Sequence, residues 1–108
     1  ICVDSRQTND FIVGVPFSGC PEGLVATRED EAIGIAVGAW LAGKKPLVFF
    51  QNSGLGNCVD IITSLLKPYQ IGIDLLVQHR NEPEHHALMG EITPDLMRLM
   101  RYDTFRIC

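Results

Sequence analysis

The strongest constraint on the fold is the alternation of short apolar runs with segments of helical periodicity. Residues 11–15 form a β-branched apolar run, and residues 47–50 and 73–77 are similar runs, as expected of buried strands. Between them, residues 29–42 and the segment after Asn57 carry apolar side chains at helical spacing. Strands that alternate with helices predict an α/β fold, here a three-layer sandwich with a mainly parallel sheet flanked by helices.

Capping signals predict where the helices begin and end. Gly43, followed by a proline at position 46, is typical of the end of the first helix. Asn57 is expected to cap the second helix, which Pro68 ends. Thr93 and Pro94 are expected to begin the third helix, because proline suits a first helical turn.

Length and composition predict one small domain over residues 1–108. The chain is 46% apolar and 20% charged, and no apolar run approaches the roughly 20 residues of a membrane span. A net charge of −4 without a basic run argues against nucleic-acid binding. The cysteines at positions 2, 20, 58 and 108 form no CxxC pair and have no metal-ligand spacing, which predicts reduced thiols in a cytoplasmic protein.

Polar residues gather where the predicted strands end. In parallel sheets of this kind, ligands bind at the carboxyl ends of the strands. The strand before the first helix is poorly marked in the sequence and is expected to end near residue 27. We therefore expect a site at this edge, built from the residues that follow the four strands: Phe17 and Ser18, Thr27 and Arg28, residues 51–57, and Gln78, His79 and Arg80.

Three acids begin the first helix, and helical spacing turns one of them inward. Acidic residues in a first turn can simply suit the helix dipole. Glu29, however, shares a face with Ile33 and Ala36, whereas Asp30 and Glu31 do not. An inward carboxyl group at a site suits a proton donor or relay, so Glu29 is the candidate for that role.

Residues 51–57, with the sequence QNSGLGN, allow three interpretations. The glycines can serve only a tight turn, they can form an anion nest, or they can present bare backbone to a flat heterocycle. The segment lacks the lysine and the spacing of a P-loop and does not match GxGxxG. The residues by themselves leave the three interpretations open.

The histidine-rich segment after the last strand has no metal-ligand spacing. His79, His85 and His86 form no His-x-x-x-His pair and have no cysteine partner, so no metal site is predicted. One interpretation is a histidine that acts on a substrate, because its pKa lies near working pH. The other is a solvated loop without a role.

Three motifs together resemble the pyrimidine-binding domain of thiamine diphosphate-dependent decarboxylases. They are TREDEAIGIAVGAWLAGKKP, QNSGLGN and EPEHHALMGEITPDL. The resemblance is strongest to the phosphonopyruvate and sulfopyruvate decarboxylases and covers most of the chain from residue 11 onward.

This resemblance implies roles for particular residues. Glu29 would hydrogen-bond the aminopyrimidine ring of thiamine diphosphate and promote its imino tautomer, so that the cofactor can add to a 2-oxo acid and accept electrons as carbon dioxide leaves. His85 would be a second catalytic residue. Arg28 and Arg80 are candidates for a second anion, because arginine matches sulfonate and phosphonate oxygens. The implied cofactor-binding residues are Thr27, Glu29, Gln51, Asn52, Ser53, Gly54, Leu55, Gly56 and Asn57, and the implied substrate residues are Phe17, Ser18, Arg28 and Arg80.

The chain also departs from the family pattern. Position 17 is Phe where cysteine is common, and segments are expected near residues 19–25 and 80–81 that the sequence does not contain. No Gly-Asp-Gly…Asn signature is present to hold Mg2+ and the diphosphate. The resemblance therefore implies a diphosphate-binding β subunit or domain as partner, with the active site at the interface of an oligomer.

The predicted function is that of the pyrimidine-binding subunit of a decarboxylase for sulfopyruvate or phosphonopyruvate. One alternative is a non-enzymatic assembly or regulatory module that retained the fold. Another is a related thiamine diphosphate carboligase.

Overall fold

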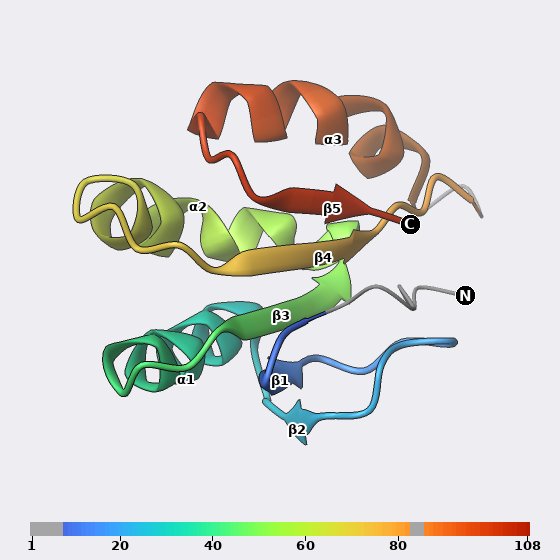
Figure 1. The fold of residues 1–108 in the computed structure, drawn as a ribbon. Helices are drawn as coiled ribbons and strands as arrows, with labels where there is room; N and C mark the ends of the chain where they lie inside the picture. The colour runs from blue at the N-terminus through green and yellow to red at the C-terminus, as the bar shows by residue number, and fades with distance from the viewer. Residues whose placement is uncertain (1–7, 83–85) are drawn as a thin grey trace.

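The parallel sheet of five strands is the centre of the molecule (Figure 1). The computed structural model describes residues 8–82 and 86–108. The strands lie in the order β2-β1-β3-β4-β5, and each neighbouring pair is parallel. The predicted α/β fold with a parallel sheet flanked by helices is confirmed and is consistent with a three-layer sandwich. The strands are β1 Phe11–Gly14, β2 Leu24–Val25, β3 Pro46–Gln51, β4 Asp74–Gln78 and β5 Phe105–Ile107.

The helical segments follow the predicted order, but two of them begin earlier than predicted. The first, α1 Glu29–Leu41, begins and ends close to the predicted positions. The others are the 3-10 helix η1 Asn52–Cys58, the short α2 Val59–Ile61, the π-helical η2 Ile62–Leu66, and α3 Ala87–Met100.

The prediction that Asn57 caps the second helix is wrong. The chain is helical from Asn52, directly after β3, and continues through η1, α2 and η2 without a break. Leu55 and Cys58 are fully buried, so the first turns of this helical segment belong to the core. The Asn57 amide makes a different contact and donates a hydrogen bond of 2.9 Å to Glu29 Oε1.

The prediction that α3 begins at Thr93 is also wrong, because Pro94 lies inside the helix. A proline at this position leaves the carbonyl of Gly90 without its usual helical donor. His79 Nε2 lies 2.8 Å from that carbonyl oxygen, and the Thr93 hydroxyl donates to the carbonyl of Met89. Side chains therefore satisfy the backbone around Pro94, and the helix runs through it.

The two faces of the sheet pack against different partners. On one face, strand residues join side chains from α1, η1, η2 and α3 in one buried cluster. On the other face, Leu47, Phe49 and Leu76 form a second cluster, and Phe17 and Cys20 of the loop after β1 pack against it. The first cluster includes Val13, Val48, Phe50, Leu75 and Val77 from the strands and Ile33, Leu55, Ile62, Leu66 and Met97 from the helical segments.

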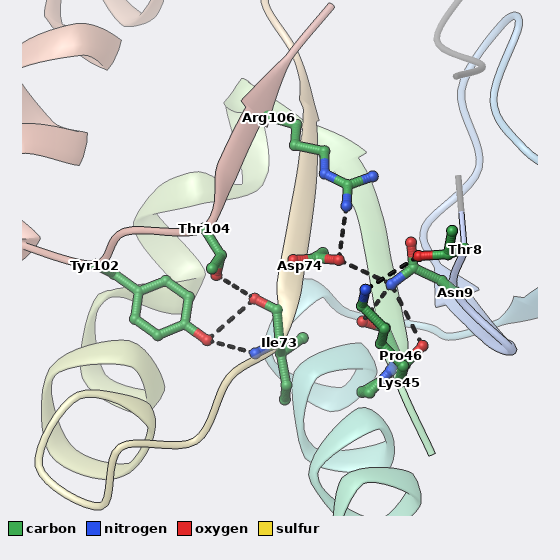
Figure 2. A network of polar contacts seen from close by, with 9 residues as sticks. All are labelled: Thr8, Asn9, Lys45, Pro46, Ile73, Asp74, Tyr102, Thr104 and Arg106. Carbon is green, nitrogen blue, oxygen red and sulfur yellow. Dashed lines mark hydrogen bonds and ion pairs between the residues drawn. The ribbon is translucent and has the colours of Figure 1, made fainter. Parts of the chain in front are cut away.

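A polar network closes the amino-terminal edge of the sheet (Figure 2). Asp74 Oδ2, at the start of β4, accepts a hydrogen bond of 2.8 Å from Asn9 Nδ2 and pairs with Arg106 Nη2 of β5 at 2.7 Å. Beside them, the Tyr102 hydroxyl accepts from the amide of Ile73 at 2.8 Å and lies 3.0 Å from its carbonyl oxygen. This network holds the strand starts together at the edge opposite the predicted site.

The connection from β1 to β2 is short. It runs over residues 15–23 without a helix, and β2 itself is exposed. A crossover between parallel strands usually takes about a dozen residues or more. The expectation that family segments are absent near residues 19–25 stays a prediction.

The cysteines differ from one another in state. Cys20 and Cys58 are free thiols, as predicted. Cys108 is disulfide-bonded, so the prediction of four reduced thiols is wrong. Sequence spacing misses such a bond, because it does not show which chain segments meet in space. Over residues 8–82 and 86–108, no helix has the length and apolar character of a membrane span.

Candidate active site

Glu29 is the main candidate residue at the edge of the sheet where the predicted site residues gather. It is the first residue of α1, and its side chain lies against η1. Its Oε1 accepts the hydrogen bond from Asn57, and its Cδ and Oε2 would lie only 2.3 and 2.4 Å from a Cβ placed on Gly54. The carboxylate therefore occupies the space that a side chain at position 54 would need. The structure places Glu29 facing inward, in the orientation that helical spacing predicts.

The other two acids of the first turn bond to residues that directly precede α1. Glu31 Oε1 accepts a hydrogen bond of 2.7 Å from the backbone amide of Thr27. Asp30 Oδ1 accepts from Arg28 Nε at 3.0 Å. The hydrogen bond and the positive charge of Arg28 hold the pKa of Asp30 below its usual value. Both acids thus stabilise the start of α1, which is the structural role that the dipole argument gives them.

Glu29 keeps one oxygen available for a ligand. Among the described residues, only its Oε1 has a hydrogen-bond partner, while Oε2 lies beside the backbone of Gly54. Cys58 is close to this carboxylate and donates to the carbonyl of Gly54 at 3.6 Å. Burial, and then the negative charges of Glu29 and Asp30, raises the pKa of the Cys58 thiol to about 12. The Cys58 thiol is therefore protonated near neutral pH and is a poor nucleophile.

A row of amide side chains connects three strand ends. Gln51 and Gln78 are register partners at the ends of β3 and β4. Gln51 Nε2 donates to Gln78 Oε1 at 3.2 Å, and Gln78 Nε2 donates to the carbonyl of Ser18 at 3.3 Å. The hydroxyl of Ser53 extends the row by donating to Gln51 Oε1 at 3.3 Å. The structure thus brings Ser18, Gln51 and Ser53 together, as the parallel topology predicts.

Asn52 makes a second group at the same edge. Its side chain is fully buried. Its Oδ1 accepts from the backbone amide of Arg80 at 2.9 Å, and its Nδ2 donates to the carbonyl of Arg80 at 3.0 Å and to Thr93 Oγ1 at 2.9 Å. Thr93 was not predicted to belong to this group. A threonine before a proline is typical of a helix start, and its sequence position gives no sign of the contact with Asn52.

The remaining predicted residues are placed differently. The Phe17 ring stands edge-on to Phe49 at 6.0 Å and belongs to the second core cluster. Leu55 is buried in the main core, while Gly56 is exposed. His85 lies outside the described residues. Within the described residues, no group of three acidic, histidine or cysteine side chains is arranged to hold a metal ion.

A hollow of about 470 Å³ lies between the start of α1 and the segment from Asn57 to Leu65, and its lining does not include Glu29. Arg28, Asp30 and Asp60 are among the residues that line it. The edge combines the Glu29 carboxylate, which covers Gly54, with the row of amide side chains. A carboxylate at such an edge can exchange a proton with a polar ligand.

The comparisons with known proteins point to decarboxylases. The chain is 42% identical over 78 residues to "Sulfopyruvate decarboxylase subunit alpha" of Methanothermobacter thermautotrophicus, which covers 68% of this chain and 47% of that protein. It is 53% identical over 59 residues to the protein of the same name from Methanocaldococcus jannaschii, covering 55% and 35%. It is 45% identical over 82 residues to "Phosphonopyruvate decarboxylase" of Streptomyces viridochromogenes, covering 70% and 20%.

The matches extend over only part of these relatives. The chain spans less than half the length of the three proteins named above. No protein-family model matches it. Over the part that aligns, the chain is similar to sulfopyruvate decarboxylase α subunits and phosphonopyruvate decarboxylases, which confirms the resemblance that its motifs predict.

Proposed function

We propose that this chain is the pyrimidine-binding subunit of a thiamine diphosphate-dependent 2-oxo acid decarboxylase. The observation that carries the proposal is the seating of Glu29 against Gly54 and Asn57, both in the QNSGLGN motif. The proposed substrate is sulfopyruvate or phosphonopyruvate, which loses carbon dioxide and gives the aldehyde. The names of the relatives support this substrate class.

The donor set fits the pyrimidine end of the cofactor. Thiamine diphosphate, when bound, supplies the carbon that adds to the 2-oxo group and accepts the electron pair of the departing carboxylate. Glu29 would exchange a proton with a ring nitrogen through Oε2, because Asn57 already holds Oε1. Gly54 gives that carboxylate room, because a Cβ at position 54 would clash with it. The amide row of Gln51 and Gln78 would close the sheet edge beside it.

A partner protein would complete the site. The chain contains no Gly-Asp-Gly…Asn signature, and the described residues hold no metal cluster. Mg2+ and the diphosphate would therefore be held by a diphosphate-binding subunit or domain in an oligomer. The cytoplasmic location stays a prediction, since Cys20 and Cys58 are free but Cys108 is disulfide-bonded.

The test is reconstitution. The chain is mixed with a diphosphate-binding partner, thiamine diphosphate and Mg2+, and carbon dioxide release is measured with sulfopyruvate and with phosphonopyruvate. Release from one of the two acids is the expected result. No release from either acid, in a mixture whose calorimetry shows cofactor binding, would overturn the proposed substrate class and favour a carboligase, for which a panel of 2-oxo acids is the next assay.

Cofactor binding distinguishes the proposed decarboxylase subunit from a non-enzymatic assembly or regulatory module. A subunit with this function binds thiamine diphosphate only when the partner is present. If calorimetry detects no binding with or without the partner, the chain is an assembly or regulatory module and the proposal is wrong.

A further inference from the structure

Two buried polar side chains meet at the carboxyl edge of the sheet. Over residues 8–82 and 86–108, Asn52 and Thr93 are the two polar residues that are fully buried, and they bond to each other. Buried polar groups are costly unless all their hydrogen bonds are made. Here the Asn52 amide makes three bonds, and the Thr93 hydroxyl also donates to Met89. A fully satisfied buried pair of this kind fixes the elements that it joins.

Asn52 continues the β3–β4 ladder with its side chain. The last backbone register pair is Gln51 with Gln78. One residue past β3, the Asn52 amide pairs with both the N–H and the C=O of Arg80. The side-chain amide thus makes the pair of hydrogen bonds that a neighbouring strand would make. These bonds hold the backbone of Arg80 in place after β4 has ended.

Arg80 differs from Arg28, the other candidate for anion binding. Arg28 Nε is paired with Asp30 at 3.0 Å. The guanidinium of Arg80 donates to the carbonyl of Glu82 at 3.1 Å and, among the described residues, pairs with no carboxylate. A guanidinium has five N–H donors in a fixed fork, so most of those of Arg80 are left for an anion.

Residues of the helix η1 contact both Arg80 and Glu29. Asn52 at its start holds Arg80, and Gly54 and Asn57 hold Glu29. η1 also packs against both α1 and α3. One rigid segment of seven residues therefore sets the position of the proposed anion-binding arginine relative to the proposed proton-transferring carboxylate.

We propose that Asn52 is a positioning residue that holds Arg80 for the second anion of the substrate, and that it does not itself contact the cofactor. This inference rests on the proposed function, because it takes a sulfonate- or phosphonate-bearing acid as the ligand. Asn52 acts through Arg80, and both N–H donors of its buried amide are already used.

The experiment measures discrimination between a dianion and a monoanion. The reconstituted complex with partner, thiamine diphosphate and Mg2+ is titrated with 3-sulfopropanoate and with propanoate. The first carries carboxylate and sulfonate, the second only carboxylate, and neither has a 2-oxo group to react. The readout is the ratio of the two dissociation constants. Wild type should prefer 3-sulfopropanoate, and Asn52→Ala should lower this preference by about tenfold or more, the effect of losing a charge-assisted contact.

A double mutant shows whether Asn52 acts through Arg80. Arg80→Ala should lower the preference as well, and adding Asn52→Ala to it should change the ratio less than about twofold. If Asn52→Ala does not fold, Asn52→Ser, which keeps a small polar group, should lower the ratio in the same direction.

Thr93→Val is the matched control for a general loss of stability. It removes the hydroxyl but leaves both contacts between Asn52 and Arg80. The variant should lower the melting temperature and leave the ratio within about twofold of wild type, because the position of Arg80 is kept.

Four results would overturn the inference. They are a wild type without preference for 3-sulfopropanoate, an unchanged ratio in Asn52→Ala, a full Asn52→Ala effect in the Arg80→Ala background, and a Thr93→Val effect as large as that of Asn52→Ala. If the ratios follow the expectation but the wild-type complex releases no carbon dioxide, the proposed function fails and the positioning role stands.

Discussion

Gly54 shows how one residue without a side chain can set the chemistry of a neighbour. Its φ is not in the left-handed region, so its backbone would accept another residue. The constraint comes from Glu29, whose Cγ, Cδ and Oε2 lie within 2.4 Å of the position that a Cβ would take. Position 54 therefore requires glycine because a larger residue would overlap the Glu29 carboxylate.

Gly54→Ala should therefore displace the Glu29 carboxylate and lower decarboxylation in the reconstituted complex. A shift of about 1 Å in a reacting group can cost about a hundredfold in rate. Gly56→Ala is the matched control, because a Cβ there meets nothing within 4 Å. Steady-state carbon dioxide release gives the comparison. Equal rates for the two variants would show that the close contact at Gly54 does not matter.

Cys58 should be unreactive in the folded protein. Burial raises the pKa of its thiol from 9.0 to about 12, so at pH 8 the thiolate fraction falls by more than about a hundredfold. Alkylation with iodoacetamide, read by mass spectrometry, should modify the half-buried Cys20 first. Alkylation of Cys58 at the same rate as Cys20 would contradict the burial of this thiol.

Part of the site could be predicted residue by residue. Helical spacing separates Glu29 from Asp30 and Glu31, because only the inward position shares a face with apolar residues. The role of Asn52 could not be predicted, since its partners Arg80 and Thr93 are far away in sequence. The place of a residue in a polar motif indicates that a site is near. It does not show which atoms the side chain of that residue will hydrogen-bond.

At the scale of elements, the segment after β3 and the helix α3 show where local signals fail. Glycines and amides at residues 52–57 read as a loop, yet burial of Leu55 and Cys58 makes the segment helical. Pro94 reads as a helix start, yet His79 and Thr93 satisfy the backbone around it. In both cases tertiary contacts override the local preference of the sequence.

The Tyr102 hydroxyl should stabilise the turn between α3 and β5, whereas the exposed Tyr69 should contribute little. The Tyr102 hydroxyl bonds both backbone groups of Ile73 (Figure 2). It also lies 2.7 Å from the carbonyl oxygen of Ile71. Tyr102→Phe removes this partner from the Ile71 carbonyl and the Ile73 amide, while Thr104 still donates to the Ile73 carbonyl. The loss should lower the free energy of unfolding by about 1–3 kcal/mol. Tyr69→Phe, at a tyrosine that is 71% exposed, is the control and should change little. Urea unfolding of both variants measures the difference, and equal values would refute the anchoring role.

At the scale of the whole molecule, alternation of strands and helices predicts the class of fold and the edge where the site lies. A parallel sheet forces Ser18, Gln51 and Gln78 to one edge, whatever the details of each loop. The alternation does not predict which helices cover which face, because that depends on packing between distant segments.

The role that we propose for the Glu29 carboxylate is to transfer a proton to or from the bound cofactor. The most direct test is the rate of carbon dioxide release from sulfopyruvate or phosphonopyruvate by the reconstituted complex carrying Glu29→Gln. Glu31→Gln is the control, since Glu31 bonds the amide of Thr27 and an amide oxygen can do the same. We expect Glu29→Gln to reduce kcat by about a hundredfold or more, and Glu31→Gln to remain close to wild type. Equal rates for wild type and Glu29→Gln would contradict the proposed proton transfer by Glu29.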